Sequence, residues 1–268
     1  VAGIALMNVY IYALPPAGYF NPAAAGSEGL LDWIVWGLSF VFVEDKFRSL
    51  FAMLFGAGVA ILLERARASG DVRPIRSHVF RMLVLFAIGA GHAILLANND
   101  VLRLYAMAGL FVPLFLRLDP RKLLVAGGVL MAIHAIAGSV IAYQWITATP
   151  GTPSALLPAQ IFGNDPAALD YARAIGIESF GERLHRRIFG FGAALETLIP
   201  GIPSALGTML VGAGLWRIGL LKGEWPRARC FALARRMTLI ALPPLVAFIA
   251  VDWRAGFSGA MVGPVALF

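Results

Sequence analysis

A few polar side chains stand out in this sequence because they interrupt long apolar runs. The stretch AGHAILLANNDVLRLY contains His92, Asp100 and Arg103. An imidazole inside a membrane is expected to face the protein interior or a wet cavity, where it could act as a general base. We therefore take His92 and Asp100 as candidate catalytic residues, with Asp100 orienting or charging the site. The alternative for His92 is a packing histidine that a neighbouring hydroxyl or carbonyl group satisfies.

A second cluster, residues 44–48 (EDKFR), carries four charged side chains at the head of an apolar run. Lysine and arginine beside carboxylates can hold an anionic or carboxylate group of a substrate. The alternative is a solvated turn. Tyr19 is expected to add a hydrogen bond from the preceding segment. The candidate substrate-binding residues are Lys46, Arg48, Arg103, Asn8, Asn21, Glu44 and Asp45.

The other histidines and the single cysteine do not form a recognisable site. His134 has no charged neighbour within a helical turn, which favours a structural role, and His78 and His185 lie near basic loops. Cys230 alone excludes an internal disulfide and a cysteine-based zinc site. The chain also lacks a Walker loop, an HExxH motif and a GxSxG motif. We therefore predict no metal and no bound cofactor.

The amino-acid composition indicates the environment in which these residues lie. Of 268 residues, 59% are hydrophobic and only 14% are charged, with a mean hydropathy of +0.78. Soluble domains carry about 25% charged residues, so the chain is expected to lie in a membrane and to contact lipids. The formal net charge is +7. Basic loops on the cytoplasmic side explain this charge, so we expect no nucleic-acid partner.

The apolar runs predict an all-α, polytopic bundle of transmembrane helices. Runs of sufficient length fall at roughly 47–64, 79–97, 101–117, 123–146, 198–216 and 237–252. Basic loops at 65–78, 117–122 and 217–236 are predicted to be cytoplasmic. We treat residues 1–268 as one transmembrane domain and expect it to be incomplete at both ends, because each end lies inside an apolar run.

Two segments are predicted to lie on the outer side. Residues 30–43 are apolar, but about 21 Å of helix is too short for a hydrocarbon core of about 30 Å, so we expect an interfacial or re-entrant helix. Residues 147–197 form the one long outer loop. Asp165 followed by Pro166 is typical of a helix N-terminus, and the sequence after it is amphipathic.

An internal parallel repeat is one interpretation of two similar motifs. MLFGAG at 53–58 recurs as MLVGAG at 209–214, and each is followed by a basic loop and an Arg-Met pair. The alternative is that small residues recur in membrane bundles because they allow close helix packing.

Four sequence blocks resemble the YeiB-like family of bacterial multi-pass membrane proteins, which includes the domain of unknown function 418. These blocks are ALMNVYIYALPPAGYFNPAA, DKFRSLFAMLFGAGVAILLER, GAGHAILLANNDVLRLYAMAGL and LGTMLVGAGLWRIGLLKGE. The resemblance implies a location in the bacterial inner (plasma) membrane. It also implies a distant similarity to transmembrane acyltransferases, with acyl-CoA as co-substrate. The chain departs from the glucosaminide acetyltransferases of that group because residues 15–29 contain no histidine.

Three functions remain open from the sequence. The first is a membrane acyltransferase that moves an acyl group from a cytoplasmic donor to a glycan, lipid or small-molecule acceptor at the outer face. Its base would be His92, and Lys46, Arg48 or Arg103 would hold the anionic part of a substrate. The second is a small-molecule transporter or channel, and the third is a structural subunit of a membrane complex. The sequence indicates neither a protein partner nor an oligomeric state.

Overall fold

The computed structural model describes residues 3, 5, 8–9, 13–25, 29–97 and 101–266. In these ranges the regular structure consists of helices without strands, which confirms the prediction of an all-α protein. The chain divides into two compact units, each built from separate stretches of sequence. Unit 1 comprises residues 1–48, 135–178 and 228–268, and unit 2 comprises residues 49–134 and 179–227. The prediction of one transmembrane domain stays a prediction.

Unit 1 contains short helices and one long helix around an aromatic core. Its elements are α2 (Pro16–Phe20), η1 (Pro22–Ala25), α3 (Leu30–Phe42), α8 (Pro153–Phe162), α9 (Pro166–Gly176), α14 (Gly259–Ala266), nearly all of α13 (Arg227–Arg254) and the second half of α7 (Pro120–Ile146). Trp36, Phe162, Phe257 and Val262 form the buried centre of this unit. Large rings pack there in edge-to-face contacts, which stabilise an aromatic cluster beyond its buried area.

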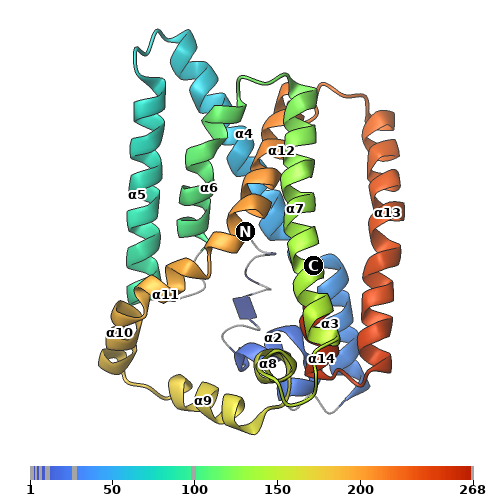
Figure 1. Ribbon diagram of the computed structural model, residues 1–268. Coiled ribbons are helices and arrows are strands. Elements are labelled where there is room, and N and C mark those ends of the chain that lie inside the picture. Colours follow the sequence, from blue (N-terminus) through green and yellow to red (C-terminus); the bar gives the residue numbers. More distant parts are fainter. Residues whose placement is uncertain are drawn as a thin grey trace. The chain divides into compact units, whose positions relative to one another are not determined.

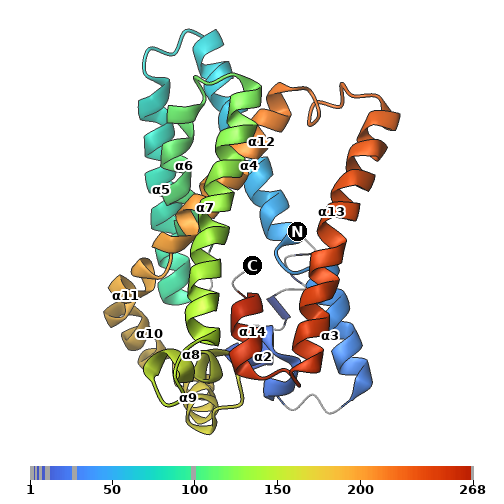
Figure 2. The ribbon, with the colours of Figure 1, turned by 45° about the vertical axis from the view of Figure 1, so that its right-hand side comes forward.

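Small residues bring α14 against α8 in unit 1, and Figures 1 and 2 both show these two helices side by side. A side chain at Gly259 would collide with the backbone of Ala159, and one at Gly263 would press on Phe162. The two glycines are four residues apart and therefore share a helix face. This is the small-xxx-small packing that membrane helices use.

Unit 2 is built from the longer apolar helices. Its elements are α4 (Lys46–Ala68) from Ser49 onward, α5 (Pro74–Leu95), α6 (Leu102–Phe115), the first half of α7, α10 (Phe180–Phe189), α11 (Phe191–Glu196), η2 (Ile199–Gly201) and α12 (Ile202–Arg217). Its core is made mainly of aliphatic side chains from α4, α6 and α12, including Leu63, Val112 and Met209. In Figures 1 and 2, α5 and α6 run side by side.

The helices of the described residues include five that are long and apolar enough to cross a membrane. These candidate spans are Leu30–Ala68, Pro74–Leu95, Pro120–Ile146, Phe191–Arg217 and Arg227–Arg254, and the shorter apolar helix α6 covers Leu102–Phe115. Each predicted run overlaps one of these helices. Large apolar side chains such as Phe80, Ile136 and Leu239 are more than 60% exposed. A soluble protein rarely exposes so much apolar surface, so these helices indicate a membrane protein.

The predicted outer segments are helical, and their placement in a membrane stays a prediction. Residues 30–43 correspond to α3, which is separated from α4 only by a turn and shares one candidate span with it. The N-cap prediction at Asp165 is confirmed, because its carboxylate accepts a hydrogen bond from the Ala168 amide at 2.8 Å. The amphipathic segment that follows is divided into α9 and α10.

A reciprocal capping box starts α10. Ser179 and Glu182 exchange hydrogen bonds between their side chains and backbone amides, which satisfies amides that would otherwise lack a partner at the helix start. Hydrogen bonds from Ser179 hold the pKa of the exposed Glu182 carboxyl below its usual value. Local sequence therefore defines this boundary.

Candidate functional site

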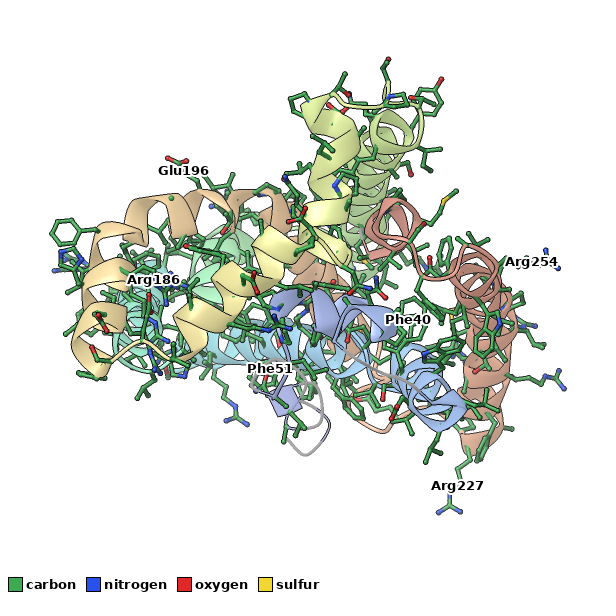
Figure 3. All side chains as sticks on the ribbon, turned by 90° about the horizontal axis from the view of Figure 1, so that it is seen from below. Phe40, Phe51, Arg186, Glu196, Arg227 and Arg254 are labelled. Carbon is green, nitrogen blue, oxygen red and sulfur yellow. The ribbon has the colours of Figure 1, made fainter. Side chains whose placement is uncertain are left out.

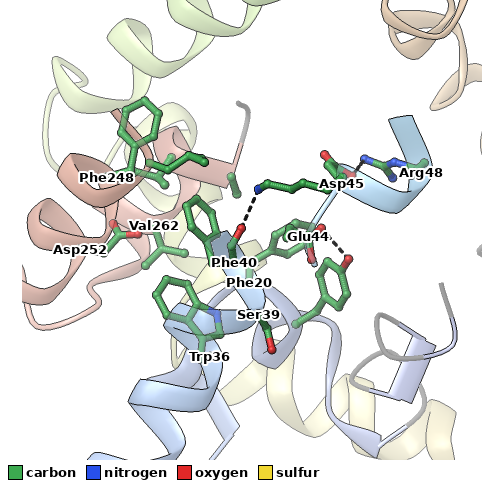
Figure 4. Close-up of a pocket in the computed structure, with 15 residues that line it drawn as sticks. Phe20, Trp36, Ser39, Phe40, Glu44, Asp45, Arg48, Phe248, Asp252 and Val262 are labelled. Carbon is green, nitrogen blue, oxygen red and sulfur yellow. Dashed lines mark hydrogen bonds and ion pairs between the residues drawn. The ribbon is translucent and has the colours of Figure 1, made fainter. Parts of the chain in front are cut away.

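A cavity of about 210 Å³ lies in unit 1, with aromatic and aliphatic walls and a charged group of residues on one side (Figure 4). Its lining residues come from α2, α3, the turn after α3, the start of α4, α13 and α14. They are Tyr19, Phe20, Trp36, Ser39, Phe40, Glu44, Asp45, Lys46, Arg48, Leu245, Phe248, Asp252, Val262, Val265 and Ala266. Mostly apolar walls with a few polar groups are typical of small-molecule sites.

The turn between α3 and α4 places the charges of residues 44–48 on this cavity. Asp45 has a positive φ of 57°, a conformation that aspartate tolerates better than most residues. Arg48 forms an ion pair with Asp45 one helical turn away. Asp45 lies between the end of α3 at Phe42 and the start of α4 at Lys46, so its left-handed backbone redirects the chain there, and four neighbouring charges line one cavity.

Lys46 caps the end of α3. Its Nζ donates a hydrogen bond of 2.7 Å to the carbonyl oxygen of Phe40 and lies 5.5 Å from the centre of the Phe40 ring. The last carbonyl groups of a helix lack partners within the helix, so a lysine at this position satisfies one of them. The ammonium group is thereby held at the cavity wall.

Tyr19 and Glu44 form a short hydrogen bond at the cavity wall, with the Tyr19 hydroxyl donating to Glu44 Oε1 at 2.6 Å (Figure 4). Burial raises the pKa of the Tyr19 phenol, and the negative charge of Glu44 and the hydrogen bond to it raise it further. The phenol therefore stays protonated and orients the Glu44 carboxylate.

Asp252, in the last turn of α13, is not among the residues predicted from the sequence. Its side chain is completely buried, and neither carboxylate oxygen accepts a hydrogen bond from any residue that the structure describes. Burying a polar group without a partner is costly, and an ionisable group inside an apolar helix marks a functional site by default. The available signal was a carboxylate at the end of the apolar run predicted for residues 237–252.

Asn21 connects the end of α8 to the turn after α13 through hydrogen bonds. Its Nδ2 donates to the carbonyl oxygens of Phe162 at 2.6 Å and Phe257 at 2.8 Å, and its Oδ1 accepts from the Ala23 amide at 2.9 Å. Phe257 has a positive φ of 54°, which is unfavourable for a bulky residue. Asn21 therefore stabilises a strained turn, and it does not line the cavity.

The remaining predicted residues lie elsewhere or outside the described residues. His92 is half-buried near the end of α5 in unit 2, and Arg103 is buried in α6 of the same unit, 5.6 Å from the centre of the Phe191 ring. Asp100 lies outside the described residues. Asn8 is half-buried in unit 1 and does not line the cavity. The structure thus places His92 and the 44–48 cluster in different units.

Two other histidines bind backbone carbonyl groups in unit 2. His78 Nε2 lies 2.9 Å from the carbonyl oxygen of Gly109, and His134 Nδ1 lies 3.1 Å from that of Pro200. Since a carbonyl oxygen only accepts, each ring nitrogen is the donor. These bonds agree with the structural role expected for His134.

The Glu196 carboxylate is exposed and projects away from the ribbon of α11 (Figure 3).

The described helices thus indicate a helical membrane protein, and unit 1 contains a small, mostly apolar cavity with a charged side. Over 259 residues the chain is 31% identical to the uncharacterized protein YeiB of Escherichia coli (strain K12), covering 94% of the chain and 63% of YeiB. It is 36% identical over 84 residues to the uncharacterized protein YxaH of Bacillus subtilis (strain 168), covering 31% of the chain and 21% of YxaH. These similarities support the YeiB-like resemblance.

The chain covers only part of the length of each of these relatives, namely 63% of YeiB and 21% of YxaH. A third similarity, at 31% identity over 111 residues, is to an uncharacterized 39.9 kDa protein of Bacillus acidopullulyticus. No family model matches the chain. No solved structure matches it either.

Proposed function

We propose that this chain is a membrane acyltransferase whose acceptor binds in the unit 1 cavity. One observation carries the location of the site: Tyr19 and the four charged residues of the 44–48 cluster line a single, mostly apolar cavity. The same cluster is predicted from the sequence to bind substrate. Acyl transfer is inferred from the resemblance of the motif blocks to a family related to transmembrane acyltransferases.

The side chains that line the cavity include a carboxylate and an ammonium group that can serve acyl transfer from a thioester. In the proposed step, the acceptor oxygen or nitrogen attacks the acyl carbonyl of acyl-CoA, a new C–O or C–N bond forms, and the C–S bond breaks. Glu44 accepts the acceptor's proton and passes it to the leaving thiolate. Lys46 stabilises the negative charge that develops on the carbonyl oxygen. Tyr19 positions Glu44.

Transfer of a labelled acyl group in lipid nanodiscs tests this proposal. The full protein is incubated with acyl-CoA carrying a labelled acyl chain and with lipid, glycan and small amine or alcohol acceptors. Glu44→Gln should lower kcat by about 10²- to 10⁴-fold, the usual contribution of general acid–base catalysis. Asp32→Asn, which removes an exposed carboxylate of α3 away from the cavity, is the matched control.

His92→Ala distinguishes the two candidate bases. If Glu44 is the base, His92→Ala keeps the wild-type turnover and Glu44→Gln loses it. If His92 is the base, His92→Ala loses turnover and Glu44→Gln keeps it. Wild-type protein that transfers no acyl group to any acceptor, or two variants that both keep full turnover, would reject the proposal.

Transport of a small molecule is the second candidate, and Asp252 is the observation that favours it. Buried ionisable groups in apolar helices commonly mark substrate or ion pathways. Saturable flux into protein-containing liposomes without acyl-CoA, abolished in Asp252→Asn, would support transport over acyl transfer.

A further inference from the structure

We infer that the unit 1 cavity binds a ligand with an ammonium group and that Asp252 is the counter-ion of this group. The inference takes the cavity as the ligand site of the proposed function and names the chemical class of the ligand. It rests on the position and surroundings of a single buried carboxylate.

One face of α13 forms part of the cavity wall. Leu245, Phe248 and Asp252 are spaced three and four residues apart, so they lie on the same side of the helix. All three line the cavity, and Figure 4 shows Asp252 on the same wall as Phe248 and Val262. Asp252 is therefore the one residue with a polar side chain among the three residues of α13 that line the cavity.

The charges of the cavity do not balance. Three carboxylates but only two cationic side chains line it. Glu44 accepts a hydrogen bond from Tyr19, and Asp45 is paired with Arg48. Asp252, by contrast, has no hydrogen-bond partner among the described residues, although it is completely buried. A cation supplied by a ligand would compensate this charge.

Aromatic rings make the same cavity suitable for an ammonium group. Phe20, Trp36, Phe40 and Phe248 line it, and the rings of Trp36 and Phe40 stack with their centres 5.5 Å apart. The faces of aromatic rings attract cations, and cages of such rings bind quaternary ammonium ligands. A buried carboxylate combined with aromatic walls selects an organic cation over an anion.

The opposite side of the cavity is compatible with an anionic or hydroxyl group on the same ligand. Figure 4 shows Arg48 and Asp45, which form an ion pair, on the side away from Asp252, and Lys46, the residue after Asp45, also lines the cavity. A small amino alcohol or a zwitterion would place its ammonium group near Asp252 and its polar end near Lys46. In the reaction proposed above, such an amino alcohol could be the acyl acceptor.

Isothermal titration with two amines and a neutral isostere tests the inference directly. The full protein is placed in phosphatidylglycerol nanodiscs, which contain no choline or ethanolamine headgroup to compete. Choline and ethanolamine are titrated without acyl-CoA, and 3,3-dimethylbutan-1-ol serves as the uncharged analogue of choline. At least one amine should bind saturably, whereas the neutral alcohol should bind at least about tenfold more weakly, because it cannot pair with a carboxylate.

The variants identify the group that recognises the cation. Asp252→Asn keeps the shape of the side chain and should weaken amine binding by about 10- to 100-fold, as expected when one partner of a buried charge pair is removed. Asp32→Asn should bind like the wild type. The thermal midpoint of Asp252→Asn without amine should equal or exceed that of the wild type, because no described residue loses a hydrogen bond.

Several outcomes would overturn the inference. Equal binding of choline and its neutral analogue would show an apolar pocket only, and unchanged binding in Asp252→Asn would show a protonated carboxyl packed in the core. No saturable binding of either amine to folded wild-type protein, or a lowered midpoint in Asp252→Asn, would equally reject it. Amine binding without acyl transfer would refute the enzyme proposal alone, and acyl transfer without amine binding would refute this inference alone.

Discussion

Gly56 of α4 and Gly212 of α12 meet at a reciprocal helix crossing in unit 2. A side chain on Gly56 would collide with the backbone of Met209, and one on Gly212 would collide with the backbone of Met53. Each methionine stands three residues before the other glycine, so the two copies of the repeated motif pack against each other in the same way. The internal repeat stays a prediction, but its two motifs share one packing role.

This crossing predicts that Gly56→Ala and Gly212→Ala are strongly destabilising. The added methyl group would meet main-chain atoms that cannot rotate away, so the helices must separate. Overpacking typically costs about 1–3 kcal/mol. The measurement is the free energy of unfolding, or the thermal midpoint, in a mild detergent.

Gly58→Ala is the control on the same helix, because nothing lies within 4 Å of a side chain added there. Alanine is favoured over glycine in a helix by roughly 0.5–1 kcal/mol, so this variant should be neutral or more stable. Equal effects of Gly56→Ala and Gly58→Ala would contradict a backbone contact at the crossing.

Asn21→Ala should destabilise unit 1. The change removes the donor for the carbonyl oxygens of Phe162 and Phe257 and releases the strained turn at Phe257. Each carbonyl group left buried without a partner costs about 1–3 kcal/mol. Limited proteolysis and the thermal midpoint report the loss.

The control for Asn21 is the exposed Asn164, whose amide donates one hydrogen bond to the Ala23 carbonyl oxygen. Asn164→Ala should shift the midpoint far less. A small effect at Asn21 together with a large one at Asn164 would show that the buried amide does not hold the turn.

The Tyr19 hydroxyl predicts a pH dependence of stability. Its pKa is raised above the ordinary value near 10, so the unfolded chain loses the phenol proton before the folded protein does. The stabilisation from the protonated phenol is therefore present below about pH 10 and is lost as the pH rises further. Above pH 10 the free energy of unfolding can fall by at most about 1.4 kcal/mol per pH unit. The actual fall is smaller, because the side chain is half-buried and solvent screens it.

Tyr19→Phe should be less stable than the wild type at neutral pH by about 1 kcal/mol, because the hydrogen bond to Glu44 is lost. This difference in stability, the gap between the two proteins, should narrow between pH 10 and 11. The wild type loses stability there, whereas phenylalanine has no proton to lose. Urea titrations of both proteins at several pH values measure this gap. A gap that stays constant or widens would be inconsistent with a raised pKa.

Local sequence was sufficient for much of the fold. Apolar runs located the long helices because a helix that contacts lipid must be apolar along its length, and Asp165 marked a helix start through its own side chain. The charged cluster at 44–48 was recognisable because four charges are costly at the head of an apolar run. The structure places all four on one cavity.

Contacts between distant segments could not be predicted. Asn21 binds carbonyl groups 141 and 236 residues away, and sequence spacing carries no information about such partners. In the sequence Asp252 stands at the end of an apolar run. Its burial could not be predicted, because burial depends on the helices that pack around it. The acyltransferase hypothesis also gave His92 and Lys46 roles in one reaction, and the structure places these residues in different units.

Arg217 in unit 2 predicts a charge-specific effect at a helix terminus. The sequence assigns it to a basic cytoplasmic loop, but its Nε donates to Glu64 at 2.9 Å and its guanidinium also donates to the Leu116 and Leu118 carbonyl oxygens at 2.8 and 3.3 Å. The side chain of Arg217 is 17% exposed and that of Glu64 is 41% exposed, so solvent weakens the pair. A lysine cannot reproduce three donations from one planar group.

Arg217→Lys should therefore lower the free energy of unfolding by about 1–2 kcal/mol, and Arg217→Met by more, because the end of α6 then loses its donor. Arg227→Met, which removes an exposed arginine of the same basic segment, should change it by less than about 0.5 kcal/mol. A double-mutant cycle with Glu64→Gln separates the ion pair from the carbonyl contacts. If the cycle gave no coupling and Arg217→Lys were as stable as the wild type, Arg217 would serve only as a topological charge.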